Sequence, residues 1–274
     1  MNPLHERIRR LPAGVEFLVV VSWAFGLPIF TSIMSLGVDG GTRTATGGAL
    51  VLDNNALLNI LVLELIQSAF LIWFLRVRGW TLEKFGLTIS WRGTGVGWLL
   101  LVGTYVLAMG AQTLAAAVLP AAMEGAVQRY PVPDPKVSMQ LVFLTSTVNG
   151  IFEELFVAGY IITALSAVRG MWTAINVSTV VRLLYHLYQG PLGVVIIVPL
   201  GLLYGYVYAR TRQLWPLILA HVLIDIVSLS TRAHRHREPV IGRPAARRLK
   251  WGPDPITRPG GNASRAPRAA PRAA

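Results

Sequence analysis

The sequence of 274 residues contains no cysteine and few charged residues. Without cysteine, the chain cannot form disulfides, thiolate metal sites or a cysteine nucleophile. Charged residues make up only 14% of the chain, whereas average soluble proteins contain about a quarter. Hydrophobic residues make up 53%. This composition excludes an ordinary soluble domain and indicates a protein embedded in a membrane.

Several common catalytic motifs are also missing. The sequence has no H-E-x-x-H, G-x-S-x-G or G-K-[ST] pattern, and these are the markers of zincins, serine hydrolases and P-loop proteins. The glycine-rich stretch 37–48 lacks the lysine of a phosphate-binding loop and is predicted to be a plain connection.

Long apolar stretches divide the chain into candidate membrane helices, each near the length of about 20 residues that a bilayer requires. Gly and Pro within Gln189-Gly190-Pro191 split the longest stretch in two. The resulting fold class is all-α, a polytopic membrane protein with about seven transmembrane helices, in the plasma membrane. The seven stretches are 17–38, 54–75, 93–123, 137–168, two helices within 170–209, and 213–231.

The net charge of +12 is concentrated in a tail, residues 232–274, which holds 11 basic and two acidic residues. Its Arg, Pro and Ala content predicts disorder. The tail could bind anionic lipid or serve only for solubility, and no specific nucleic-acid partner is expected. Residues 1–231 form the predicted membrane domain.

Arg and Lys in the short loops alternate as they do in a chain with a cytoplasmic N-terminus. Seven helices would then leave the basic tail outside, against the same rule. Three explanations stay open: an eighth membrane segment, one segment that does not cross, or an exported tail.

Ionisable residues at bilayer depth cost about 3 kcal/mol each, so each needs a reason. Glu64 is alone in the second stretch and is either a packing residue or part of a cavity lining. The others gather in the fourth, fifth and seventh stretches, where they form either a structural polar network or a reactive site. They are Glu153, Glu154, Arg182, His186, His221 and Asp225.

The spacing of these residues suggests a division of roles. Arg182 and His186 are four residues apart, as are His221 and Asp225, so each pair shares a helix face. The adjacent Glu153 and Glu154 lie about 100° apart around a helix. One carboxylate can therefore face a reacting centre while the other engages a neighbouring cation.

Three segments resemble the motifs of the CPBP intramembrane proteases, a family that includes the CAAX prenyl endopeptidases and the bacterial Abi-type proteins. The segments occur in the family's order and cover about residues 139–229. They are Glu153-Glu154-Leu-Phe-Val-Ala158, Arg182-Leu-Leu-Tyr-His186 and His221-Val-Leu-Ile-Asp225.

The resemblance implies hydrolysis of a peptide bond within the membrane, in a hydrophobic or lipid-modified substrate such as a prenylated peptide. It assigns Glu153 as the base that activates water and His186 as its partner. His221 and Asp225 would be a second pair that binds metal or stabilises the oxyanion. Zn²⁺ or another divalent ion would have Glu153, His186, His221 and Asp225 as ligands, but a water held by Glu and His alone is equally compatible.

The sequence departs from the family pattern at two positions. Ala158 stands where the family has an Arg, and Arg182 stands where it has a Phe. We therefore expect Arg182 to replace the missing cation from the next motif helix and to keep Glu154 charged.

Two other functions compete with the protease. A family member without catalysis would act as a membrane scaffold or immunity protein. A proton-coupled transporter would also use Glu, His and Asp in the membrane. Transporters usually carry internal repeats, and this sequence shows no such symmetry.

Overall fold

A computed structural model describes residues 3–38, 51–124 and 132–237 of the chain. These residues lie in one compact unit, Met1–Glu238, and a second unit comprises Pro239–Ala274. The predicted glycine-rich connection from residue 39 onward and the predicted disordered tail from residue 238 onward lie outside the described residues.

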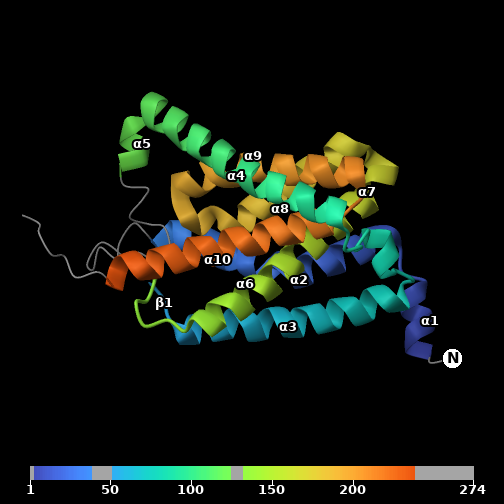
Figure 1. Ribbon diagram of the computed structural model, residues 1–274. Helices are drawn as coiled ribbons and strands as arrows, with labels where there is room; N and C mark the ends of the chain where they lie inside the picture. The colour runs from blue at the N-terminus through green and yellow to red at the C-terminus, as the bar shows by residue number, and fades with distance from the viewer. Residues whose placement is uncertain (1–2, 39–50, 125–131, 238–274) are drawn as a thin grey trace, which may run out of the picture. The chain divides into compact units, whose positions relative to one another are not determined.

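Within the described residues the fold is all-α and built from long apolar helices (Figure 1). By length and composition, five of them qualify as membrane spans, one of which runs through the break at Gln189, and Trp215–Thr231 is a shorter apolar helix. The polytopic membrane fold is thereby confirmed. The long elements are α2 (Ala13–Val38), α3 (Asn54–Val77), α4 (Trp91–Val118), α6 (Met139–Glu153), α8 (Met171–His186), α9 (Gly190–Thr211) and α10 (Trp215–Arg237).

Short elements connect or extend these helices. The two strands pair in parallel over two residues each. The short elements are α1 (Pro3–Arg9), β1 (Val51–Leu52), the 3₁₀ helix η2 (Leu82–Phe85), α5 (Pro120–Glu124), β2 (Val132–Pro133), the π-helix η4 (Glu154–Tyr160), α7 (Ile161–Arg169) and the 3₁₀ helix η5 (Leu187–Gln189).

Local chemistry explains where several helices start and stop. The Asp53 carboxylate accepts a hydrogen bond from the Ala56 N–H and caps α3, and the Ser90 hydroxyl caps α4 in the same way. The predicted break at Gln189-Gly190 is present as η5, and Gly190 has a φ of 69°, which favours glycine.

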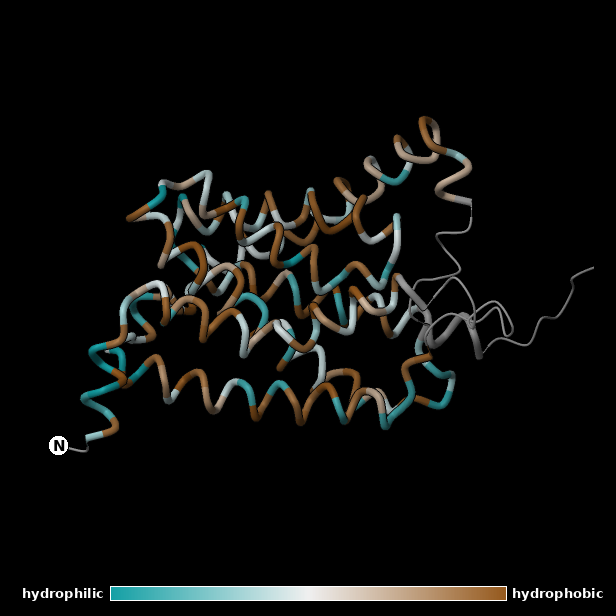
Figure 2. Tube along the Cα trace, turned by 180° about the vertical axis from the view of Figure 1, so that it is seen from behind, coloured by the Kyte–Doolittle hydropathy of each residue, from teal (hydrophilic) through white to brown (hydrophobic). Residues whose placement is uncertain are grey.

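Hydrophobic residues make up much of the helical trace (Figure 2), and many large apolar side chains are exposed, as a bilayer requires. Leu18, Ile66 and Val106 are among those that are exposed. The span Met139–Arg169 is more buried than the other spans. In its most apolar stretch 61% of the residues are buried, against 17% in the corresponding stretch of Trp91–Val118. The helices that hold the two adjacent glutamates therefore form the centre of the bundle.

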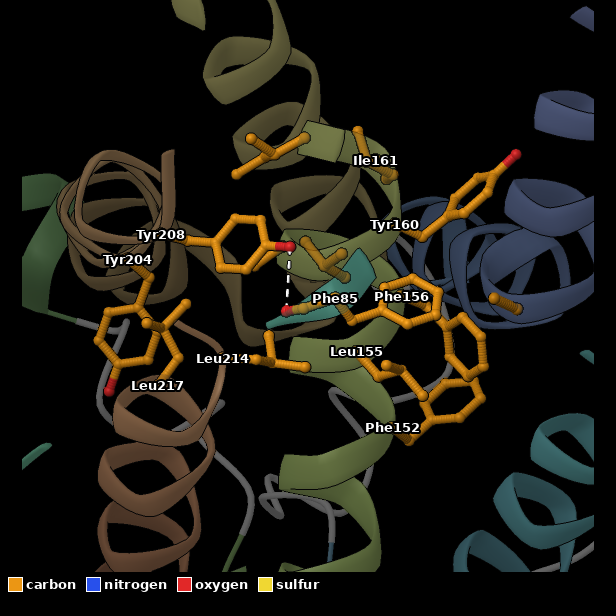
Figure 3. Close-up of a cluster of buried hydrophobic side chains, with 14 of the residues drawn as sticks. Phe85, Phe152, Leu155, Phe156, Tyr160, Ile161, Tyr204, Tyr208, Leu214 and Leu217 are labelled. Carbon is orange, nitrogen blue, oxygen red and sulfur yellow. Dashed lines mark hydrogen bonds between the residues drawn. The ribbon is translucent and has the colours of Figure 1, made fainter. Parts of the chain in front are cut away.

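The fourth predicted helix is continuous but not a regular α-helix, which corrects the sequence prediction. It consists of α6, then the π-helix η4, then α7. Phe156 and Tyr160 of η4 are buried in a cluster of apolar side chains that also contains Phe85 and Phe152 (Figure 3). The turns of a π-helix are wider than those of an α-helix. Here a side chain from another helix supplies a donor, because the Ser178 hydroxyl donates to the Val157 carbonyl of η4.

The basic short loops all lie at one end of the bundle (Figure 1). There Arg78 donates to the Ile8 carbonyl, and the Leu214 N–H donates to the Gly86 carbonyl. At the other end, the Tyr188 N–H donates to the Ser32 hydroxyl. The basic loops therefore share one side of the bundle, and the cytoplasmic position of that side stays a prediction.

The last helix corrects the predicted boundary of the tail. Helix α10 continues to Arg237, so the tail prediction began six residues too early, at residue 232. The helix ends at the opposite end of the bundle from α1 (Figure 1). The described residues contain no eighth long helix.

Candidate active site

The six ionisable residues expected from the sequence come together where α6, η4, α8 and α10 meet. α6 contacts α10, and η4 contacts α8 and α10. Glu153 is the last residue of α6 and Glu154 the first of η4. The remaining four are Arg182 and His186 on α8 and His221 and Asp225 on α10.

Glu154 is enclosed by positively charged or hydrogen-bonding groups. Its side chain has no exposed surface, and Arg182 is 2% exposed. Arg182 Nη2 donates to Glu154 Oε1 at 2.8 Å and to Oε2 at 2.9 Å. His221 Nδ1 lies 2.6 Å from Oε1. The predicted ion pair between Arg182 and Glu154 is therefore present, while Ala158 is buried within η4.

Glu153 points in a different direction and has different partners. Its Oε2 accepts hydrogen bonds from the Tyr185 hydroxyl at 2.6 Å and from Arg182 Nη1 at 3.4 Å. Its Oε1 accepts from Asn149 Nδ2 at 3.3 Å. His221 Nε2 lies 4.0 Å from Oε2, a gap at which a water molecule can bridge two polar groups.

The ring orientation of both histidines follows from their neighbours. His186 Nδ1 lies 2.9 Å from the Arg182 carbonyl oxygen. Because a carbonyl can only accept, His186 Nδ1 must carry the proton, and Nε2 is left as an acceptor in the neutral ring. His221 Nδ1 faces the Glu154 carboxylate, and its Nε2 lies 3.6 Å from Asp225 Oδ2.

A cavity of about 580 Å³ lies on the Glu153 side of this cluster. It is lined by Glu153, His186, His221 and Asp225, together with apolar residues of α2 and α3. It extends toward the end of the bundle where α2 ends and α3 begins. Four of the six predicted residues thus share one cavity, and Glu154 and Arg182 lie behind it.

Residues 135–227 match the family described as Type II CAAX prenyl endopeptidase Rce1-like. The matched residues are called the Rce1-like domain below. The match confirms the family resemblance predicted from the three motifs, and all six residues lie within it. No curated protein and no solved structure matches the chain.

A second cavity of about 200 Å³ lies between the Rce1-like domain and the N-terminal helices α2 and α3. Glu64 and Gln67 of α3 line it together with Glu153 and His186. Glu64 Oε1 accepts a hydrogen bond of 2.7 Å from Asn149 Nδ2. Of the two interpretations of Glu64, the structure supports the one in which it lines a cavity at the site.

The side chains in the Rce1-like domain have the right chemistry for a metal ion but not the right arrangement. Among the described residues, no group of three His, Asp or Glu side chains is placed to hold one ion. Glu153 Oε2 already accepts from Tyr185 and from the positively charged Arg182. This arrangement does not fit a metal held by Glu153, His186, His221 and Asp225.

Two residues that contact Glu153 were not predicted from the sequence. Tyr185 directly precedes His186 in the second motif, and Asn149 lies one helical turn before Glu153. The spacing of four residues could have identified Asn149. The contact from Tyr185 depends on the packing of α8 against η4, which a sequence does not reveal.

Proposed function

We propose that the protein is an intramembrane endopeptidase that cleaves a hydrophobic or lipid-modified peptide, including prenylated peptides. The observation that carries this proposal is that Glu153 and His186 line the same cavity. The carboxylate of Glu153 and the free Nε2 of His186 can hold one water molecule between them. Membership of the Rce1-like family supports the same reaction class. The apolar lining from α2 and α3 suits an apolar substrate.

The first step is the attack of water on the peptide carbonyl carbon. Glu153 accepts one proton of the water, and His186 Nε2 accepts a hydrogen bond from the other O–H, which orients the nucleophile. The water oxygen forms a bond to the carbonyl carbon, and the carbonyl oxygen becomes an oxyanion. Arg182 and Tyr185 hold Glu153 in place throughout.

The second step is the collapse of the tetrahedral intermediate. His221, protonated on both ring nitrogens, donates from Nδ1 to Glu154 and from Nε2 to the oxyanion. Asp225 lies beside Nε2 and supports the charged ring. Glu153 gives its proton to the amide nitrogen, the C–N bond breaks, and the products are a carboxylic acid and an amine, after which the acid loses its remaining O–H proton to water.

No step of this mechanism passes through a metal ion, since among the described residues no three His, Asp or Glu side chains are grouped to hold one. We also propose the plasma membrane as the location. The basic tail is proposed to adhere to anionic lipid, at about 1 kcal/mol for each basic residue near the surface.

The test is cleavage of membrane-derived and prenylated peptides by the purified protein, with Glu153→Gln and His186→Ala variants. Glu83→Gln is the matched control, since Glu83 is exposed at the other end of the bundle. Cleavage by the wild type and the control, and its loss in both site variants, supports the proposal. Cleavage that survives both site variants contradicts it. No cleavage by the wild type would favour the non-catalytic scaffold.

A further inference from the structure

A chain of three side chains links helix α3 to the proposed base. Asn149 Nδ2 has two hydrogens and donates one to Glu64 Oε1 at 2.7 Å and one to Glu153 Oε1 at 3.3 Å. One amide nitrogen therefore joins two carboxylates from different helices. Neither Glu64 nor Asn149 is among the residues that the three family motifs contain.

Glu64 has few hydrogen-bond partners for a buried carboxylate. It is 7% exposed, and its Oε2 is buried without a hydrogen-bond partner among the described residues. No described Lys, Arg or His forms an ion pair with it. An apolar side chain would pack at this position without the desolvation penalty of the carboxylate. Stability alone therefore does not account for Glu64.

The geometry gives Glu64 a specific effect on Asn149. A carboxylate can only accept hydrogen bonds, so Glu64 holds the nitrogen of the Asn149 amide, and not its oxygen, toward the two carboxylates. Without Glu64, the amide could rotate and place its oxygen against Glu153 Oε1, where both atoms are acceptors. Glu153 Oε1 would then lose its hydrogen bond from Asn149.

We propose that Glu64 is a positioning residue that acts through Asn149 to orient the Glu153 carboxylate. Tyr185 and Arg182 hold Oε2, and Asn149 holds Oε1, so the plane of the carboxylate is fixed relative to the cavity. This role rests on the proposed function, because it assumes that Glu153 is the base. It extends the reactive site from the Rce1-like domain to the N-terminal helices.

The test compares kcat and KM in a set of variants. Glu64→Leu and Asn149→Ala should each lower kcat about 10-fold to 100-fold, the size expected for a misplaced catalytic group, and change KM less than about twofold. Glu64→Gln should keep most of the activity, because its amide oxygen can still accept from Asn149. The double variant Glu64→Leu/Asn149→Ala should be no slower than the worse single variant, since both act on one link.

Gln67→Leu is the matched control on the same helix. Gln67 also lines the smaller cavity, but its Nε2 donates to the Trp23 carbonyl at 2.8 Å and not to Asn149. In the double variant Gln67→Leu/Asn149→Ala, the fold-change in kcat should therefore equal the product of the two single fold-changes. Unchanged kcat in Glu64→Leu, a change in KM alone, or multiplied effects in the Glu64→Leu/Asn149→Ala double variant would overturn the proposal.

Thermal unfolding provides a readout that needs no cleavage. Glu64→Leu/Asn149→Ala should unfold within about 2 °C of the less stable single variant, because coupled residues are not additive. Additive losses in Tm would show that the two side chains act separately and would overturn the proposal. Loss of cleavage in Glu153→Gln tests the endopeptidase itself, so the two failures remain distinguishable.

Discussion

Glu153 and Glu154 are neighbours in the chain but belong to two contrasting regions. The closed region, around Glu154, has no exposed carboxylate surface and contains Arg182 bound to both oxygens. The open region, around Glu153, faces a cavity that His186 and Asp225 also line. The π-helix η4 begins between the two glutamates and lies within the core.

In the proposed function, the difference separates a structural charge, that of Glu154, from a reactive one, that of Glu153. In the closed region the charge of Glu154 is balanced, and the carboxylate also orients His221. In the open region the carboxylate keeps access to water and substrate, which a general base needs. One adjacent pair of residues thus supplies both a fixed support and the proposed base. The following predictions test whether the two regions differ in this way.

The largest expected contrast is between the two isosteric changes Glu153→Gln and Glu154→Gln. Glu153→Gln should lower kcat about 10³-fold, within the usual range for a general base, and leave Tm nearly unchanged. Glu154→Gln should destabilise the protein by about 3 kcal/mol, because it breaks a buried ion pair. Peptide cleavage measures kcat, and thermal unfolding in detergent measures the stability of both variants. Equal losses of stability in the two variants would contradict the division.

The second prediction concerns the cation of the closed region. Arg182→Phe should abolish most of the activity and cost about 3 kcal/mol of stability, because Glu154 loses its bidentate partner. Adding Ala158→Arg should restore activity, since it returns the cation to the position that the family pattern uses. If Arg182→Phe alone is harmless, the compensation between the two positions is wrong.

A smaller effect is expected for Tyr185→Phe. The change removes a hydrogen bond of 2.6 Å to Glu153 Oε2 but keeps the ring that stacks on Phe25. Loss of one hydrogen bond to a charged group should reduce kcat about 10-fold. Steady-state kinetics measure this, with Tyr206→Phe, at an exposed position on α9, as the control. A KM effect without a kcat effect would place Tyr185 in substrate binding instead.

The smallest effect is expected from metal removal. Incubation with a chelator should change the cleavage rate less than about twofold, because the reacting residues use their partners within the protein and do not form a metal-binding group. Elemental analysis of the same sample accompanies the assay. Loss of activity that added Zn²⁺ restores would show that the side chains rearrange around an ion.

Hydropathy located the helices, because a bilayer requires long apolar stretches, and Gly and Pro divided the longest stretch into two. The break at Gln189-Gly190 and the start of α3 at Asn54 illustrate this. The π-helix η4 was not predictable in the same way. Its sequence, Glu154–Tyr160, reads as an ordinary apolar helix, and its extra width depends on donors such as Ser178 from another helix.

The candidate site shows the same limit. The cost of charge in a membrane identified Glu153, Glu154 and the residues of the next two motifs, and the two departures from the family pattern predicted that Arg182 would pair with Glu154. The hydrogen bond between His221 and Glu154 and the one that Asn149 donates to Glu64 were not predicted. Both join residues 67 or more positions apart, and only the packing of the helices brings them together.

The position of the larger cavity makes the two sides of the membrane unequal for this protein. The cavity reaches from Glu153 to Ser35 and Leu52, at the end of the bundle where α2 ends and α10 also ends. At the opposite end, Glu16 accepts hydrogen bonds from Arg78, Trp80 and Tyr160 and ties the helices together. In the proposed reaction, water would therefore approach Glu153 from one aqueous compartment, and a substrate anchored in the bilayer would have to expose its scissile bond toward that compartment.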